Sequence, residues 1–203
     1  MNCRKPAADL PADAEKKSET REKILATALT LFTMRGFFGT PTSLISKEAG
    51  VATGTLFFYF PTKDDLIDTL YRRIKSEAAQ AMCLGIGEGE NVQEKLRRLA
   101  YNLVEWGIQN SEKLTFIVQF AHSPFITTSA HEEGMSHFLP LQEIVRDGIR
   151  EGTIRDIDPP LLFRMMASAL FSLIERASAV EDPAGRKKIT EEGLEFIFHG
   201  MMV

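Results

Sequence analysis

The 203-residue sequence predicts an all-α fold of about nine helices. Along most of the chain, apolar residues recur at spacings of three and four, which is the period of an amphipathic helix. The chain contains only seven valines, and no stretch alternates apolar and polar residues over six positions, so strands are not expected. With 44% hydrophobic and 26% charged residues, the composition excludes a disordered chain and a small disulfide framework.

The first 19 residues are expected to form a disordered arm, because prolines and mixed charges occur there without a helical period. They also lack the apolar region that a secretory signal needs. Two distant cysteines, Cys3 and Cys83, do not suggest a disulfide framework, and the longest apolar stretch, 161–174, is too short to span a bilayer. We therefore expect a cytoplasmic protein with no cofactor and no membrane association.

The first helix is predicted over residues 20–35, where a helical period begins and Gly36 occupies the position of a left-handed C-terminal cap. A short second helix is expected to follow. Thr40 is its predicted N-cap, Pro41 lies in its first turn and Gly50 ends it.

The third segment begins at Thr53, a good N-cap, and continues through the aromatic run 54–60. Aromatic residues favour strands, but a strand here would have no partner and would lie between helices, so both readings stay open and a helix is favoured. If Leu56 and Phe60 face the core of a helical unit, four other residues must lie largely outside it: Thr55, Phe57, Phe58 and Tyr59.

Thr62 and Asp65 form a weak capping-box pattern at the start of a long helix that is expected to reach about residue 84. The glycine-rich segment 85–89 is expected to be a loop. No strand precedes it and it contains no basic residue, which argues against a nucleotide-binding loop. The remaining helices are predicted over 91–109, 111–121, 126–151, 159–179 and 187–201.

The formal net charge of -4 conceals an uneven distribution of charge. Residues 20–75 carry eight basic and five acidic side chains, a net of +3, whereas the chain beyond residue 75 has a net charge of -7. Two helices joined by the three-residue turn 50–52 in this basic third are typical of a helix-turn-helix, whose second helix enters the major groove. Gly54 would let its backbone approach DNA closely, and exposed aromatics on so short a helix suggest a binding surface.

The same segment resembles the TetR family of one-component transcriptional regulators over about 50 residues. The resemblance implies a DNA-binding domain over 20–66 and a helical effector-binding and dimerisation domain over 67–203, where only the architecture is similar. The matching positions are Thr20, Arg21, Ile24, Leu25, Ala28, Phe32, Gly36, Phe37, Thr40, Ile45, Ala49, Gly50, Val51, Gly54, Thr55, Leu56, Tyr59, Phe60, Lys63 and Leu66.

The resemblance implies a homodimer that places its two recognition helices in successive major grooves of a pseudo-palindromic double-stranded operator. Position by position, Thr40 and Thr53 would cap helices and donate hydrogen bonds to phosphates, and Thr55 would contact the backbone or a base. The side chains expected to face the groove are Phe57, Phe58 and Tyr59. Lys63 is expected to pair with a phosphate.

The sequence departs from the family pattern at four positions, two in the third predicted helix and two in the second. Phe57 stands where the family usually has tyrosine, so a phosphate-directed hydroxyl is missing. Phe58 occupies a position that is often polar, which would replace hydrogen-bond readout by contact with a thymine methyl group. Leu44 and Ser46 are unusual as well, so the second helix is expected to pack somewhat differently.

A small hydrophobic effector is expected among the helices of residues 91–151, as the family resemblance implies. Large apolar side chains could line the cavity and histidines could anchor a polar group, although each aromatic taken alone is more often an ordinary core residue. The candidate lining residues are Trp106, Phe116, Phe120, His122, Met135, His137 and Phe138. No metal site is expected, because His131 and His137 lie six residues apart, which is not a zinc-ligand spacing.

The stretch 161–174 is apolar almost all round and must be covered on both sides. The resemblance implies a four-helix dimer interface built from this helix and the last one, and a monomer with a thick core is the alternative. The candidate interface residues are Met166, Ala169, Leu173, Ala177, Leu194, Ile197, Phe198 and Met201.

The sequence therefore indicates a ligand-responsive, sequence-specific DNA-binding regulator, with repression expected. The alternative is a helical protein that binds small molecules without binding a specific DNA sequence. An enzyme is disfavoured, because the neighbours His122 and Ser123 cannot both orient into one catalytic triad and no paired catalytic motif occurs.

Overall fold

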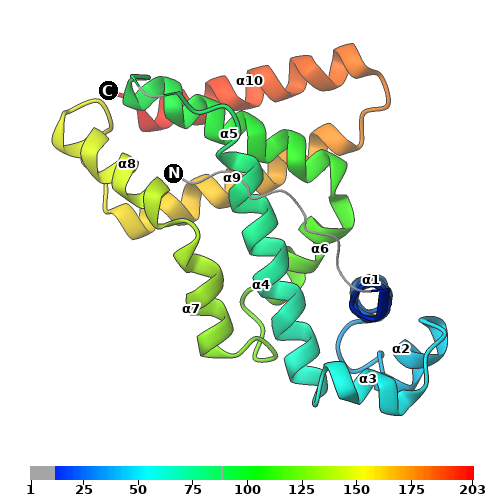
Figure 1. Cartoon of the computed structure of the whole chain (residues 1–203). Coiled ribbons are helices and arrows are strands. Elements are labelled where there is room, and N and C mark those ends of the chain that lie inside the picture. The colour runs from blue at the N-terminus through cyan, green and yellow to red at the C-terminus, as the bar shows by residue number, and fades with distance from the viewer. Residues whose placement is uncertain (1–11, 88) are drawn as a thin grey trace. The chain divides into compact units, whose positions relative to one another are not determined.

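The computed structural model describes residues 12–87 and 89–203, and it contains ten α-helices in that part of the chain (Figure 1). The all-α prediction is therefore confirmed. An isolated antiparallel bridge joins Ile154 to Met202 outside the helices. The chain divides between Leu70 and Tyr71 into two compact units, whereas the sequence placed the domain boundary after residue 66.

The first unit contains α1 (Ala12–Arg35), α2 (Thr42–Glu48), α3 (Thr53–Tyr59) and the beginning of α4 (Lys63–Met82). Gly36 and Gly50 follow α1 and α2 with φ of 68° and 67°, a left-handed conformation that suits glycine and ends each helix as predicted. The core of this unit is apolar. Its fully buried members include Ile24, Phe32, Ile45, Leu56 and Leu66.

Two boundaries differ from those expected. Helix α1 begins at Ala12, so residues 12–19 are helical and do not belong to a disordered arm. After Pro11 this segment is rich in alanine, glutamate and lysine, which are strong helix formers and need no apolar period to extend an established helix. The rest of the expected arm, residues 1–11, lies outside the described residues.

The ambiguous aromatic segment is helical. Helix α3 spans Thr53–Tyr59, with Leu56 and Phe60 buried as the helical reading required. Its neighbours along the chain are helices, so a strand would have left backbone donors and acceptors without partners. The next helix begins with the predicted capping box, since Thr62 N donates to Asp65 Oδ2 at 3.0 Å and Asp65 N to Thr62 Oγ1 at 3.0 Å.

The second unit contains the remainder of α4 and six further helices. These are α5 (Val92–Gln109), α6 (Ser111–Phe120), α7 (Thr128–Ser136), α8 (Leu139–Arg150), α9 (Pro159–Ser178) and α10 (Pro183–Met201). Helix α9 packs against α5, α8 and α10 around one apolar core, and these helices lie side by side in Figure 1. Two glycines let the neighbouring helices approach α9 closely. Gly193 on α10 lies against Leu173, and Gly107 on α5 lies against Ile174.

The single helix predicted over 126–151 is in fact two helices. Helix α7 ends at Ser136, and α8 begins at Leu139 with Pro140 in its first turn. A proline has no N–H to donate and disfavours helical backbone in the residue before it, so it starts a new helix more readily than it continues one. In the part of the chain that the structure covers, no helix is both long and apolar enough to traverse a bilayer.

Candidate nucleic-acid interface and ligand pocket

The outer face of α3 is aromatic. Phe58 is 72% exposed and Phe57 is 42% exposed, while Leu56 on the same helix is completely buried. The Phe58 ring packs edge-on against Tyr59, with 5.2 Å between their centroids. A Cβ at Gly54 would meet no atom within 4 Å, so the backbone at the start of α3 is open to a binding partner. Thr55 is half-buried between the two faces.

Thr53 is the first residue of α3 and not its N-cap, which corrects the sequence prediction. The N-cap is Ala52, which has no side chain able to accept a hydrogen bond. The exposed Thr53 hydroxyl lies 3.1 Å from the hydroxyl of the buried Ser46 on α2. The unusual Ser46 therefore ties α2 to the start of α3 by a hydrogen bond, which alanine could not make.

Thr40 is not the N-cap of α2, which corrects the sequence prediction. Pro41 is the N-cap, and Thr40 is completely buried. The hydroxyl of Thr40 lies 3.0 Å from the carbonyl oxygen of Leu31 and 2.8 Å from that of Gly36, both at the end of α1. Thr40 therefore fixes the turn between α1 and α2, and its burial argues against the expected phosphate contact.

Lys63 is held by the turn that follows α1. Its ammonium donates a hydrogen bond to the carbonyl oxygen of Phe37 and lies 3.9 Å from the centroid of the Phe37 ring. Burial lowers the pKa of Lys63, and the charge of the adjacent Asp64 opposes that shift. Lys63 thus joins the beginning of α4 to the α1–α2 turn, a contact that the sequence did not suggest.

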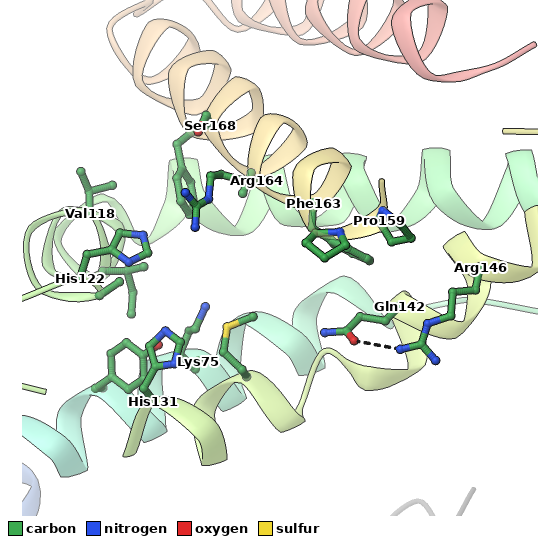
Figure 2. A pocket seen from close by; sticks show the side chains of 17 residues that line it. Lys75, Val118, His122, His131, Gln142, Arg146, Pro159, Phe163, Arg164 and Ser168 are labelled. Carbon is green, nitrogen blue, oxygen red and sulfur yellow. Dashed lines mark hydrogen bonds between the residues drawn. The ribbon is translucent and has the colours of Figure 1, made fainter. Parts of the chain in front are cut away.

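The second unit contains a cavity of about 710 Å³ between α4, α6, α7, α8 and α9 (Figure 2). This volume is within the range of ligand pockets. Seventeen residues line it: Tyr71, Lys75, Ile117, Val118, Ala121, His122, His131, Met135, Gln142, Arg146, Pro159, Pro160, Phe163, Arg164, Ala167, Ser168 and Phe171.

Of the seven residues expected to line an effector pocket, the cavity contains two, His122 and Met135. Phe116 and Phe120 are buried in the core and pack on each other at 4.9 Å between centroids. The other three do not line the cavity either: half-buried Trp106 on α5, exposed His137 at the end of α7, and Phe138, which packs against the core. Residues of α4 and α9, which the sequence did not place there, supply much of the wall.

The sequence contained a signal for two of the missed residues. Tyr71, Ile74 and Ala78 form a buried stripe on α4, and Lys75 interrupts that stripe. Arg164 is the charged residue within the apolar stretch 161–174. A charged side chain on an otherwise apolar helix face often marks a binding cavity, because it needs a polar partner there.

Lys75 lies in apolar surroundings. Its ammonium is 4.7 Å from the centroid of the Phe138 ring and 5.9 Å from that of Tyr71. Burial lowers the pKa of Lys75 to about 8 and raises the pKa of Tyr71 to about 12. The His131 ring stacks on Tyr71 with 6.1 Å between centroids, and α7 reaches this close because Gly134 packs directly on Tyr71.

The surface of α9 explains why its sequence is apolar almost all round. One face, including Leu170 and Ile174, is buried in the core, and a second face, including Phe163, lines the cavity. A third face is exposed, with Leu161 50% and Met165 60% accessible, and Phe196 on α10 is 82% accessible.

Most of the predicted dimer-interface residues are buried inside one subunit. Five of the eight belong to its buried core, two more pack against that core, and Ala169 alone remains beside the exposed face of α9. The five buried residues are Leu173, Ala177, Leu194, Phe198 and Met201, and the two that pack against the core are Met166 and Ile197. These seven therefore stabilise the subunit, and a partner would have to contact the third face.

No group of three or more His, Cys, Asp or Glu side chains within the described ranges could hold a metal ion. His131 lines the cavity and His137 is exposed at the end of α7, so the structure does not bring these two together as ligands.

Comparison with known families covers both units. Residues 24–70 match the family of bacterial regulatory proteins, tetR family, and residues 91–198 match the tetracyclin repressor-like C-terminal domain. Together these matches include α3 and most of the cavity-lining residues.

Individual relatives match over most of their length. The chain is 28% identical over 165 residues to the uncharacterized HTH-type transcriptional regulator YhgD of Bacillus subtilis, covering 77% of this chain and 83% of that protein. It is 26% identical over 173 residues to the HTH-type transcriptional repressor KstR2 of Rhodococcus jostii, covering 79% of each.

Solved structures share the fold. A TetR family transcription regulator from Marinobacter aquaeolei VT8 superposes with a TM-score of 0.82 at 21% identity, covering 93% of this chain and 98% of that one. The regulator FadR from Bacillus subtilis, in complex with stearoyl-CoA, superposes with a TM-score of 0.69 at 20% identity, covering 88% and 98%.

Proposed function

The chain belongs to the TetR family of transcriptional regulators, and on that basis we propose that it is a ligand-responsive repressor released from its operator by a small, largely apolar effector. The observation that carries this proposal is the combination, in one chain, of an exposed aromatic recognition helix and a separate cavity of about 710 Å³. The family's members are regulators and not enzymes.

The DNA contacts are proposed for α3 and the first residues of α4. Phe58 and Phe57 are the exposed groups that would enter the major groove and contact thymine methyl groups. Tyr59 and Thr55 lie beside them, and Gly54 allows the backbone to approach a phosphate. The ammonium of Lys63 has one partner in the protein and would contact phosphate with its remaining donors. The single hydroxyl hydrogen of Thr53 would have to turn from Ser46, which itself donates to the carbonyl oxygen of Ser43, to reach a phosphate.

A homodimer is proposed, with the exposed face of α9 and Phe196 of α10 at its interface. Exposed apolar residues on two neighbouring helices are costly in water, and a second copy of the same surface would cover them. The dimer would place two α3 helices in successive major grooves of a pseudo-palindromic operator, with half-sites about one helical turn, or roughly 34 Å, apart.

The effector would act by changing the separation of the two recognition helices. Helix α4 begins at Lys63, directly after α3, and carries the cavity residues Tyr71 and Lys75 further along. A ligand that displaces Tyr71 or Lys75 would therefore displace α4, the helix that follows α3. A ligand that binds the non-matching separation more tightly lowers the affinity for the operator. Repression and an apolar ligand agree with the names of two relatives, a repressor and a regulator solved with stearoyl-CoA.

Operator selection tests this proposal. The purified full-length chain is used to select duplexes from a random pool, and the pool is expected to converge on a pseudo-palindrome with half-sites one helical turn apart. Adding the effector is expected to release the selected duplex. A pool that stays random after repeated selection, although the protein remains folded, would contradict the proposal.

The alternative, a ligand-binding protein that has lost specific DNA binding, is favoured by one observation. Phe57 replaces the tyrosine that is usual in the family, which removes a phosphate-directed hydroxyl. A Tyr59→Ala variant separates the two functions. If the variant binds duplex DNA as tightly as the parent protein does, the alternative is favoured. If the variant binds duplex DNA more weakly, the proposed DNA-binding regulator is favoured.

A further inference from the structure

We propose that the ligand of the cavity is an organic anion with an apolar body, and that Lys75 and Arg164 bind its charged group. This inference rests on the proposed function, because it names the chemical class of the effector. It is carried by the charges and the polarity of the cavity wall.

Apart from Tyr71, all the ionisable side chains of the cavity wall are basic. Five of the seventeen lining residues are basic and none is Asp or Glu: Lys75, His122, His131, Arg146 and Arg164. The protein as a whole has an excess of acidic residues, with 28 Asp and Glu against 24 Lys and Arg, so a wall without acids is not a reflection of composition. Such a wall favours a negatively charged occupant.

The cations of the wall are not neutralised by the protein. Among the described residues, no ion pair joins Lys75, Arg146 or Arg164 to a carboxylate, whereas the nearby Arg72 pairs with Glu133 at 2.6 Å and Lys113 with Glu77 at 2.5 Å. Arg146 reaches only the amide oxygen of Gln142, at 3.4 Å. Lys75 is half-buried, and a half-buried cation is normally paired, so its ammonium is available to a ligand; Arg146 and Arg164 are exposed residues whose side chains line the same cavity.

The cations converge from opposite walls. Figure 2 shows Lys75 reaching into the cavity from α4 and Arg164 from α9, with His122 and His131 at the same end. Two basic groups facing each other across a space can both contact one carboxylate or phosphate. The ammonium of Lys75 lies against the rings of Phe138 and Tyr71 and pairs with no carboxylate of the described residues, so a ligand anion would be its first charged partner.

Most of the remainder of the wall is apolar and suits a hydrocarbon body, with Tyr71, Gln142 and Ser168 as the other polar side chains. The apolar part is formed by side chains from α6, α7 and α9, namely Ile117, Val118, Ala121, Met135, Pro159, Pro160, Phe163, Ala167 and Phe171. A cavity with a mainly apolar lining and a few convergent charged groups binds amphipathic ligands, since the apolar part supplies affinity and the charged groups fix orientation. A carboxylate and a phosphate would both satisfy the site.

The test uses four probes with the same alkyl chain and different head groups. Decanoate, decyl phosphate, 1-decanol and decyltrimethylammonium are each titrated calorimetrically, without DNA, into the full-length protein below their micelle concentrations. The better anion is expected to bind at least about tenfold more tightly than 1-decanol, as for a hydrogen-bonded charge, and the cation is expected to bind weakest. If decanoate is the tighter anion the ligand is a carboxylate, and if decyl phosphate is tighter it is a phosphate ester. Equal affinity for both anions and 1-decanol would overturn the proposal.

Two variants and a control identify the residues. Lys75→Met and Arg164→Met are each expected to lower the affinity for the preferred anion about tenfold and to leave the affinity for 1-decanol unchanged. Lys187→Met is the control, because Lys187 is exposed on α10 and is expected to change neither affinity. Equal losses for the anion and the alcohol would show that Lys75 only packs, and would overturn its assignment.

Operator binding without any probe is measured on the same preparations. Protein that binds the alkyl anions but selects no operator would refute the proposed function and support the anion site. Protein that binds its operator but prefers no anion would refute the anion site and leave the regulator intact.

Discussion

The hydroxyl of Thr40 holds the turn between α1 and α2. Thr40 is completely buried, and its hydroxyl lies near two carbonyl oxygens at the end of α1. These acceptors lie four and nine residues back along the chain, so one side chain joins the end of α1 to the residue before the N-cap of α2.

Thr40→Val tests this structural role. Valine keeps the shape but leaves the two carbonyl oxygens without that donor, so the free energy of unfolding is expected to fall by about 1–3 kcal/mol. Chemical denaturation measures this loss. The salt dependence of operator binding is expected to remain that of the parent, and a shallower dependence would return Thr40 to the set of phosphate contacts.

Lys63→Ala tests whether a lysine held by Phe37 also contacts DNA. Its ammonium has three donors and one of them is used by the Phe37 carbonyl, so a phosphate contact is compatible with the structure. We expect the slope of the logarithm of operator affinity against the logarithm of salt concentration to decrease by about one per contact. An unchanged slope with lower stability would mean that Lys63 serves only to hold the α1–α2 turn.

At the scale of the elements, the sequence predicted most helices well, because their periods and caps are local. Over 126–151 the apolar period continues through Pro140, so periodicity alone predicts one helix, although the proline begins a new one at α8. The cavity walls could not be predicted, because residues of α4, α6 and α9 that lie far apart in the sequence line the cavity together.

Glu77→Gln tests the contact between α4 and α6. Burial alone would raise the pKa of Glu77, but hydrogen bonds from Lys113 and Arg73, together with their charges, lower it overall. A lowered pKa stabilises the fold above the ordinary value of 4.5, and this contribution is lost as the pH falls through the folded-state value. Because the pair is partly exposed, the variant is expected to lose only about 1 kcal/mol at neutral pH.

The pH dependence is the control for that variant. Urea denaturation is repeated at neutral pH and well below pH 4.5, where the parent has lost the contribution of Glu77 and the two proteins should have nearly equal stability. A difference that stayed constant over this range would mean that the carboxylate charge does not stabilise the contact between α4 and α6.

At the scale of the whole molecule, the sequence predicted a dimer interface on α9 and α10 from residues that mostly belong to the core of one chain or pack against it. Helix α9 is apolar on both its core face and its exposed face, so its sequence does not distinguish these two faces, although Arg164 and Ser168 mark the face that lines the cavity. The division of charge does not follow the boundary between the two units. The net of +3 in residues 20–75 comes from Arg72, Arg73 and Lys75, which lie beyond Leu70 in the second unit, and residues 20–70 carry five basic and five acidic side chains.

Phe196→Glu tests the proposed dimer. Phe196 is 82% exposed, so the subunit should fold normally while the charge is buried unfavourably at the interface. Sedimentation is expected to show a monomer at concentrations where the parent is dimeric. Leu194→Ala, two residues away in the core, is the contrasting variant and is expected to cost about 2–5 kcal/mol of subunit stability. A Phe196→Glu protein that remained dimeric would place the interface elsewhere.

Recognition of a DNA sequence through α3 is the function that we propose for this chain. Its most direct test is the equilibrium affinity for the selected operator and for a scrambled duplex of equal length, both at physiological salt. We expect a preference of about a thousandfold or more for the operator, largely lost in Phe58→Ala, whose exposed ring contributes little to folding. Equal affinities of the parent protein for the two duplexes would contradict the claim.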